Sequence, residues 1–331
     1  MLVYKLKFLS ALHVDSKGTG SPETAQEFIH SDTISAALCT CWGNLYPDLK
    51  ADFFSQPEYI ISSAFPYIRD VLFFPIPKFR IWGESSLSEI KTYKSVNWIS
   101  QKVLEMVLSG KIIERSEVFV NKQFAYTKNE SQVEDLINCN PWILSERQRV
   151  NVDRLGGQSD AGTFFFAQQH FHPECGLFFI AKTSNTKSLE SVISFLGDTG
   201  IGADRNSGLG HFRVREKIAL NIKLPEKYDG SLTLSLYNPG PDDNLIRQTS
   251  SCAYNITSRS GWISGSSAGR PPIRVFEEGS YFTGQTSGRV VNLINKNLVN
   301  KYNLPLKHDV FRDFRSLSLP CAEPSWIKGA N

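Results

Sequence analysis

The sequence has no apolar stretch long enough to span a bilayer, and its first residues lack the apolar run of a signal peptide. We therefore expect a cytoplasmic protein without a membrane partner, in which the sequons at Asn129 and Asn255 have no meaning. The six cysteines are scattered and form no C-x-x-C pair, which argues against a disulfide framework. The net charge is only +3, so any nucleic-acid surface must be local.

Familiar catalytic signatures are also missing. No G-x-S-x-G or Cys…His pattern occurs. His13 and Asp15 follow the first expected strand, and His13 or His30 would be the general base if the chain cleaved RNA without a metal. None of these residues has a recognisable partner in the sequence. The sequence therefore predicts no catalytic residue and no cofactor.

One short segment resembles a metal site. His170 and His172 would face the same side of a strand, with Cys175 close behind and Cys139 as a distant partner. Zinc sites need four ligands at suitable spacing, and no second cluster accompanies this one. We favour an exposed hairpin end over a metal site.

The most informative segment is 200–212, which holds an arginine and four glycines within thirteen residues: Gly200, Gly202, Arg205, Gly208 and Gly210. A helix-like segment, 188–196, precedes it, and a strand-like segment, 212–218, follows. This order is the reverse of that in mononucleotide sites, where the loop leads into a helix. A helix C-cap turn explains Gly200 or Gly202 but not Gly208 and Gly210 as well. Exposed backbone N–H groups beside an arginine suggest contact with phosphates, here those of a polynucleotide. The glycines are equally suited to close packing of helix and sheet.

A second cationic segment lies upstream. Residues 147–154 alternate as a strand, a glycine turn follows, and 163–170 reads as the return strand. The arginines of the outgoing arm are Arg147, Arg149 and Arg154. Arginines along such an arm can follow a phosphate backbone. The alternative is an edge strand kept soluble by its charge.

The remaining pattern indicates an α+β protein. Residues 2–8 form a first strand, and a helix follows a long loop, with Ser31 or Asp32 as its N-cap. Further helix is expected near 99–108 and hairpins between 111 and 185. In the last third we expect a turn at 239–243, a loop at 265–272, and strands at 218–224, 232–236, 273–276 and 288–293.

Proteins that bind single-stranded nucleic acid combine cations with stacking aromatics. Besides the arginines above, Arg213, Arg259 and Arg270 are candidates for charge, and Phe212 and Trp262 for stacking. Arg259 and Arg270 are equally explained as solvated surface charges. Phe164–Phe166 is better explained by packing within the hairpin.

Taken in order, these segments resemble the RAMP (repeat-associated mysterious protein) superfamily of CRISPR effector proteins. The resemblance rests on His30–Thr33, Arg149–Arg154, Gly200–Phe212, Arg259–Trp262 and Glu278–Ser280. Within that superfamily the chain is most similar to the fourth Csm subunit of type III-A complexes, which holds the 5′ handle of crRNA. The expected RNA-binding residues are Arg147, Arg149, Arg154, Gly200, Gly202, Arg205, Gly208, Gly210, Arg213, His30, Arg259 and Trp262.

The resemblance implies two ferredoxin-like (RRM-like) domains, at 1–215 and 216–331, with a thumb hairpin at about 147–170. It implies a noncatalytic subunit in antiviral defence, whose partners are crRNA, a large polymerase/cyclase-like subunit, a backbone RAMP subunit and, indirectly, target RNA. Alternatives are the handle subunit of a type III-B complex, a ribonuclease that processes precursor crRNA, and an interaction protein whose arginines bind acidic partner surfaces.

Overall fold

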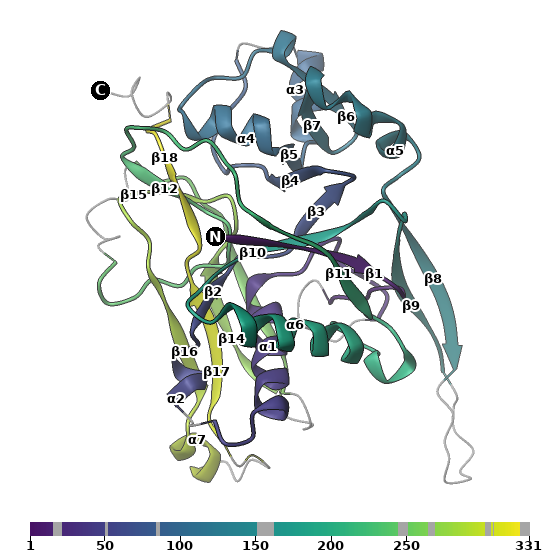
Figure 1. Cartoon of the computed structure of the whole chain (residues 1–331), viewed down its shortest axis with the longest axis vertical. Helices are drawn as coiled ribbons and strands as arrows, with labels where there is room; N and C mark the ends of the chain where they lie inside the picture. The colour runs from purple at the N-terminus through teal and green to yellow at the C-terminus, as the bar shows by residue number, and fades with distance from the viewer. Residues whose placement is uncertain are drawn as a thin grey trace.

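The computed structural model describes residues 1–15, 22–49, 52–83, 87–150, 162–243, 251–263, 269–301, 306 and 308–324 (Figure 1). The helices are α1 (Ser31–Leu45), α2 (Asp52–Ser55), α3 (Leu87–Lys94), α4 (Gln101–Leu108), α5 (Glu134–Asn138), α6 (Thr186–Thr199) and α7 (Lys296–Lys301). The strands of the first two-thirds are β1 (Leu2–Phe8), β2 (Tyr59–Ile61), β3 (Phe65–Ile68), β4 (Val71–Pro75), β5 (Trp98–Ser100), β6 (Val118–Asn121), β7 (Phe124–Thr127), β8 (Trp142–Val150), β9 (Thr163–Phe171), β10 (Cys175–Thr183) and β11 (Phe212–Ala219). Those of the last third are β12 (Gly230–Thr233), β13 (Ile256–Trp262), β14 (Gly269–Phe276), β15 (Tyr281–Thr283), β16 (Gly288–Ile294), β17 (Val310–Arg315) and β18 (Ser318–Cys321).

A nine-stranded mixed sheet organises the first two-thirds of the chain. Its order is β11-β1-β10-β3-β4-β5-β7-β6, with β2 also paired to β10. The strands from β11 to β5 pair antiparallel, whereas β5 and β7 are parallel. The α+β class expected from the sequence is confirmed.

The sheet is covered on both faces, so its central strands are buried on both sides. Along β10, Leu177 and Phe179 pack in the core under α1 and α6, while Phe178 and Ile180 pack in the core on the opposite face. The apolar positions of α6 at helical spacing, including Leu189, are all buried. Two-sided burial explains why these strands are continuous apolar runs.

The last third forms a three-stranded sheet, β15-β12-β18, and the hairpins β13–β14 and β16–β17. Leu232 of β12 and Leu319 of β18 belong to the same core as the large sheet, so the two parts share apolar packing. In the described part of the chain, no helix is long and apolar enough to cross a membrane.

Most elements expected from the sequence are present. The helix at 188–196 is confirmed as α6, and the strand–loop–helix start as β1 and α1. The expected N-cap is wrong: α1 begins at Ser31, and His30 occupies the N-cap position without a side-chain cap bond. The two residues expected as caps bond to distant segments instead. The Ser31 hydroxyl accepts a hydrogen bond from Leu236 N at 3.0 Å, and Asp32 forms an ion pair with Arg259.

The last third differs from expectation in four places. The strand expected at 232–236 ends early, because β12 stops at Thr233. The strand at 218–224 is the end of β11 followed by irregular chain. The loop expected at 265–272 is shorter, because 269–272 belong to β14. The strand β11 also runs across the boundary expected at 215/216, since Ala219 still pairs with Leu2. The division into two ferredoxin-like domains stays a prediction.

Candidate nucleic-acid interface

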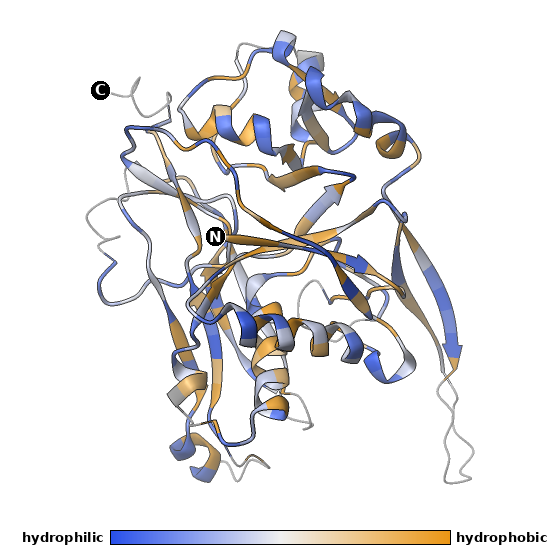
Figure 2. Ribbon diagram, in the orientation of Figure 1, coloured by the Kyte–Doolittle hydropathy of each residue, from blue (hydrophilic) through white to orange (hydrophobic). Residues whose placement is uncertain are grey.

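The hairpin β8–β9 carries two of the arginines that the sequence singles out. Its strands pair antiparallel, which places Arg147 opposite Phe166 and Arg149 opposite Phe164. Arg147 is exposed and Arg149 partly buried. Figure 2 shows β8 as mainly hydrophilic, and the hairpin extends away from the sheet. Both strands of the expected hairpin are thus present, and its use as a thumb stays a prediction.

Arg149 joins this hairpin to the glycine loop. Its guanidinium lies 4.4 Å from the ring centroid of Phe166 and forms an ion pair with Asp204. The ring of His13 packs on the same phenyl ring, with 4.3 Å between centroids. Two segments separated by 55 residues, from Arg149 to Asp204, therefore form one surface.

The glycine loop closes upon itself and upon the chain after β1. Gly200 caps α6 with a φ of 80°, and its missing side chain leaves room for the carbonyl oxygen of Leu209, 2.6 Å from where a Cβ would lie. The amide of Ile201 donates to Gly210 O at 3.0 Å. These bonds fix the loop as a compact turn before β11.

The glycines of the loop serve two different purposes. A Cβ on Gly202 would lie 2.3 Å from the carbonyl oxygen of His13. A Cβ on Gly210 would lie 1.9 Å from that of Ile201. Gly208 has a φ of 84°, yet no described atom beyond its chain neighbours lies within 4 Å of its Cβ position. Close backbone packing therefore requires glycine at positions 202 and 210, whereas Gly208 faces open space that a ligand can enter.

Further cations lie beside the loop. Arg205 begins the 3-10 helix Arg205–Ser207, and exposed Arg213 follows in β11. Arg213 pairs in register with Lys7 of β1, which is also exposed. Two residues of this surface were not expected from the sequence: Lys7, and Asp204, whose carboxylate offsets the charge of Arg149. The alternation of apolar and charged residues along β1 is the sequence signal that could have identified Lys7.

Several other residues that were expected to contact RNA do not lie on this surface or are not described. Phe212 is only 2% exposed, so its expected role in stacking is wrong. Trp262 is 60% exposed on the separate β13–β14 hairpin, where Arg270 donates to Ser260 O at 2.7 Å. Arg154 lies outside the described residues.

His30 and Arg259 are buried between the start of α1 and the last third of the chain. The His30 ring contacts Glu278 Oε1 at 2.8 Å, and Ser63 donates to the same carboxylate. The guanidinium of Arg259 donates to Asp32 at 3.0 and 3.3 Å. Both residues were expected to contact RNA. Their ion pairs give them a structural role, and RNA contact by either stays a prediction.

The carboxylates of this buried network are held in the charged state. Burial alone would raise the pKa of Asp32, but the positive charges of Arg259 and Arg312 outweigh it and lower the pKa to about 2. Burial likewise disfavours the charged form of Glu278, but the neighbouring His30 and Ser63 outweigh it and keep the pKa of Glu278 below its ordinary value.

Stability should consequently fall in acid. The pKa of Asp32 is lowered from 3.8 to about 2 on folding, so its stabilising effect is complete above the unfolded value and is lost as pH falls through the folded value. We expect this residue to contribute about 2 kcal/mol that disappears between about pH 5 and pH 2. Urea unfolding across that range measures it. The stability difference between the native chain and Asp32→Asn should shrink as pH falls, and a constant difference would contradict the assignment.

The residues considered for catalysis are constrained by the fold. His13 is 2% exposed, and its Nδ1 lies 2.8 Å from Ala167 O. Asp15 forms a bridge with Ala25 and adds to the electrostatic field at Arg259. Burial of His13 does not favour its use as the general base in the ribonuclease alternative.

The segment considered for metal binding forms the turn between β9 and β10. His170 is exposed on β9, while Cys175 is buried in β10 with its pKa raised to about 12 by burial. Among the residues that the structure describes, no group of three or more histidine, cysteine, aspartate or glutamate side chains is placed to hold a metal ion.

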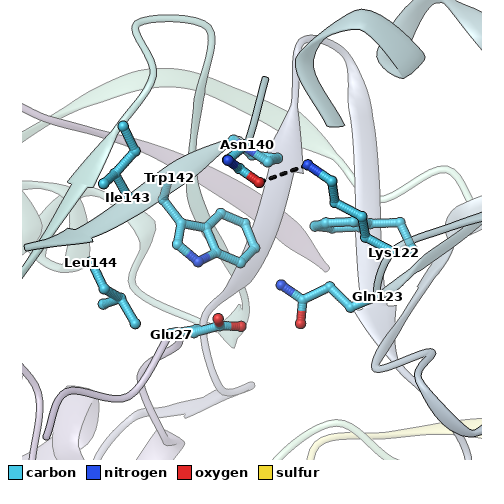
Figure 3. Close-up of a pocket in the computed structure, with 9 residues that line it drawn as sticks. Glu27, Lys122, Gln123, Asn140, Trp142, Ile143 and Leu144 are labelled. Carbon is cyan, nitrogen blue, oxygen red and sulfur yellow. Dashed lines mark hydrogen bonds between the residues drawn. The ribbon is translucent and has the colours of Figure 1, made fainter. Parts of the chain in front are cut away.

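A cavity of about 280 Å³ lies at the base of β8 (Figure 3). Trp142 and Phe124 line it, with Glu27 and Gln123 at its edge. Lys122 also lines it, but its ammonium already donates to Ile137 O, Asn138 O and Asn140 Oδ1 at 2.7–2.9 Å. A carboxylate and an already bonded lysine do not favour phosphate binding in this cavity.

Comparison with known proteins finds similarity to CRISPR proteins. Residues 226–321 match the family model for the CRISPR Csm4 C-terminal domain. The chain is 26% identical over 157 residues to the CRISPR system Cms protein Csm4 of Mycobacterium tuberculosis (strain ATCC 25618 / H37Rv), covering 45% of the chain and 52% of that relative, about half its length. It is 24% identical over 256 residues to the protein of the same name from Thermococcus onnurineus (strain NA1), covering 76% of each.

Solved structures share the fold over nearly the whole chain. The crystal structure of the Csm3–Csm4 subcomplex in the type III-A CRISPR-Cas interference complex matches with a TM-score of 0.67 at 17% identity, covering 96% of this chain and 98% of that one. The Csm1–Csm4 cassette in complex with cA4 matches with a TM-score of 0.59 at 16% identity, covering 98% of each. The match over 226–321, the relatives named Csm4 and the shared fold make this chain similar to Csm4 proteins and support the expected resemblance to the RAMP superfamily.

Proposed function

We propose that the chain is the noncatalytic subunit of a type III-A CRISPR ribonucleoprotein that binds the 5′ handle of crRNA in the cytoplasm. The observation that carries the proposal is the joining of the arginine hairpin to the glycine loop through Arg149, Phe166 and Asp204. Around that joint lie the exposed Arg147 and the open backbone at Gly208. Cations beside accessible backbone suit a phosphate chain that passes close to the protein.

The partners follow from the proteins that this chain resembles. Solved relatives are a Csm3–Csm4 subcomplex and a Csm1–Csm4 cassette. We infer that this chain likewise links a large polymerase/cyclase-like subunit to a backbone RAMP subunit, and meets target RNA only through that assembly. The strand order β11-β1-β10-β2, with α1 and α6 as crossovers, supports a ferredoxin-like first domain carrying β8–β9 as its thumb. A second such domain in the last third is inferred from the family.

Replacing Arg149, Arg154 and Arg205 together with alanine tests the proposal. We expect affinity for handle RNA to fall on the order of 100-fold. Arg154 and Arg205 would each contribute roughly 1 kcal/mol to phosphate binding, and Arg149 about as much by holding the hairpin against the loop. Because fewer phosphates are neutralised, the salt dependence of log K should also become shallower by about 2. Fluorescence anisotropy with labelled handle RNA at several salt concentrations measures both quantities.

The matched control replaces three exposed lysines, Lys102, Lys128 and Lys187, which changes the net charge equally. This control variant should keep most of the affinity for handle RNA and the native salt dependence of log K. An equal loss in both variants would mean that binding reflects overall charge alone, and retention of crRNA by the arginine variant in the assembled complex would reject the proposal.

A further inference from the structure

A second cavity lies apart from the glycine loop, between the chain that follows β4 and helix α3. Its volume is about 380 Å³, within the range of small-molecule sites. Figure 1 shows α3 near the top of the view, away from the arrowhead of β8. The cavity is lined by Arg80, Trp82, Gly83, Ile90, Tyr93 and Lys94.

Two aromatic rings form one wall. The rings of Trp82 and Tyr93 are stacked, with 4.4 Å between centroids and an interplanar angle of 9°. Ile90 lies beside them and is 39% exposed, although it is apolar. Parallel rings at the border of an open cavity provide a flat apolar surface of the kind on which a planar base stacks.

Two cations form the rest of the lining. Arg80 donates from Nε to Trp82 O at 2.9 Å and from Nη2 to Gly83 O at 2.8 Å, so neutral carbonyls hold its guanidinium in place. Lys94 is exposed at the end of α3. Within the described ranges neither cation forms an ion pair. None of the described lining residues is acidic, and the nearby carboxylate of Glu114 lies against Gly83, 2.9 Å from where its Cβ would be.

This lining differs from that of the cavity in Figure 3, which includes the carboxylate of Glu27 and a lysine already bonded to three oxygens. A positively charged pocket with stacked aromatics suits a ligand that combines a planar ring with an anion. We propose that the Arg80–Trp82–Tyr93–Lys94 pocket binds a nucleotide, its base on the aromatic wall and its phosphate between Arg80 and Lys94. The nucleotide belongs to single-stranded nucleic acid or is free.

Ultraviolet crosslinking followed by peptide mapping tests the proposal on the full chain. With a short single-stranded oligouridine as the probe, a peptide containing Trp82 or Tyr93 should carry a nucleotide. Trp82→Leu keeps an apolar contact but removes the stacking surface, and should reduce this crosslink roughly fivefold or more. Lys94→Gln should weaken it, whereas Lys91→Gln, on the same helix but outside the lining, should not.

Competition with unlabelled AMP distinguishes the two sources. Loss of the crosslink in AMP assigns the site to free nucleotides, and persistence assigns it to nucleic acid. Either result supports the pocket. The absence of both a crosslink at Trp82 or Tyr93 and any AMP-dependent rise in the unfolding temperature would overturn it, as would an unchanged crosslink in Trp82→Leu. Crosslinks to β8–β9 peptides report the proposed handle site separately, so either site can fail alone.

Discussion

Replacing Arg259 with methionine should lower the free energy of unfolding by about 3 kcal/mol. Asp32 is fully buried, and Arg259 is the cation that donates to its carboxylate, from Nη2 at 3.0 Å and Nε at 3.3 Å. Arg312 remains nearby in the variant, but its guanidinium donates to the backbone carbonyl of Asp32. A buried carboxylate without its ion-pair partner is costly, because solvent does not reach its charge and the donor that remains on it, the Thr33 hydroxyl at 3.3 Å, is neutral. The midpoint of urea unfolding at neutral pH measures the change.

The control is Arg270→Met, on the neighbouring strand of the same hairpin. Arg270 donates to the carbonyl of Ser260, so its loss should cost about 1 kcal/mol or less. Combining Arg259→Met with Asp32→Leu should recover part of the stability, since no charge is then left unpaired. Equal effects of Arg259→Met and Arg270→Met would contradict a buried ion pair between the first and last thirds of the chain.

Gly210→Ala should destabilise the protein by about 2–5 kcal/mol, combining the strain of a non-glycine residue at positive φ with overpacking. The φ of Gly210 is 75°, and an added Cβ would lie 1.9 Å from Ile201 O. The oxygen belongs to the backbone that also holds the loop closed, so it cannot move aside without opening the turn. Urea unfolding again measures the loss, and a variant as stable as the native chain would refute the close approach.

Gly208 provides the matched comparison. Its φ is 84°, but its Cβ position is open among the described residues, so Gly208→Ala should cost only about 1–2 kcal/mol. Gly208→Asn should cost less, because asparagine tolerates this conformation. If RNA approaches the backbone here, both variants should weaken handle binding, the larger asparagine more. Binding that follows stability instead would show that Gly208 serves only the turn.

The fold was largely accessible from the sequence where local pattern and tertiary environment agree. The helical spacing of Leu189 and Val192 predicted α6, and both residues are buried. The pattern failed at the N-cap of α1, because Ser31 and Asp32 bond to segments more than two hundred residues away. It failed again at 269–272, where two prolines suggested a loop but lie in the β14 hairpin strand. Long-range pairing overrode local preference at these places.

The candidate site was accessible only in part. The sequence pointed to the glycine loop and to the arginine hairpin, because both have unusual local composition. It gave no sign that Arg149 pairs with Asp204 or packs on Phe166, since nothing in a linear pattern brings residues 149 and 204 together. It also treated His30 and Arg259 as surface residues, although they are 6% and 5% exposed.

The sequence by itself determined the class of the fold, the helix before the glycine loop and the strand after it. These depend on periodicity and on backbone conformations that only certain residues adopt. Tertiary structure alone decided which glycines serve packing, which arginines are neutralised and which are open to a ligand. Those properties depend on burial and on charges from distant segments, and burial is set by how the whole chain packs.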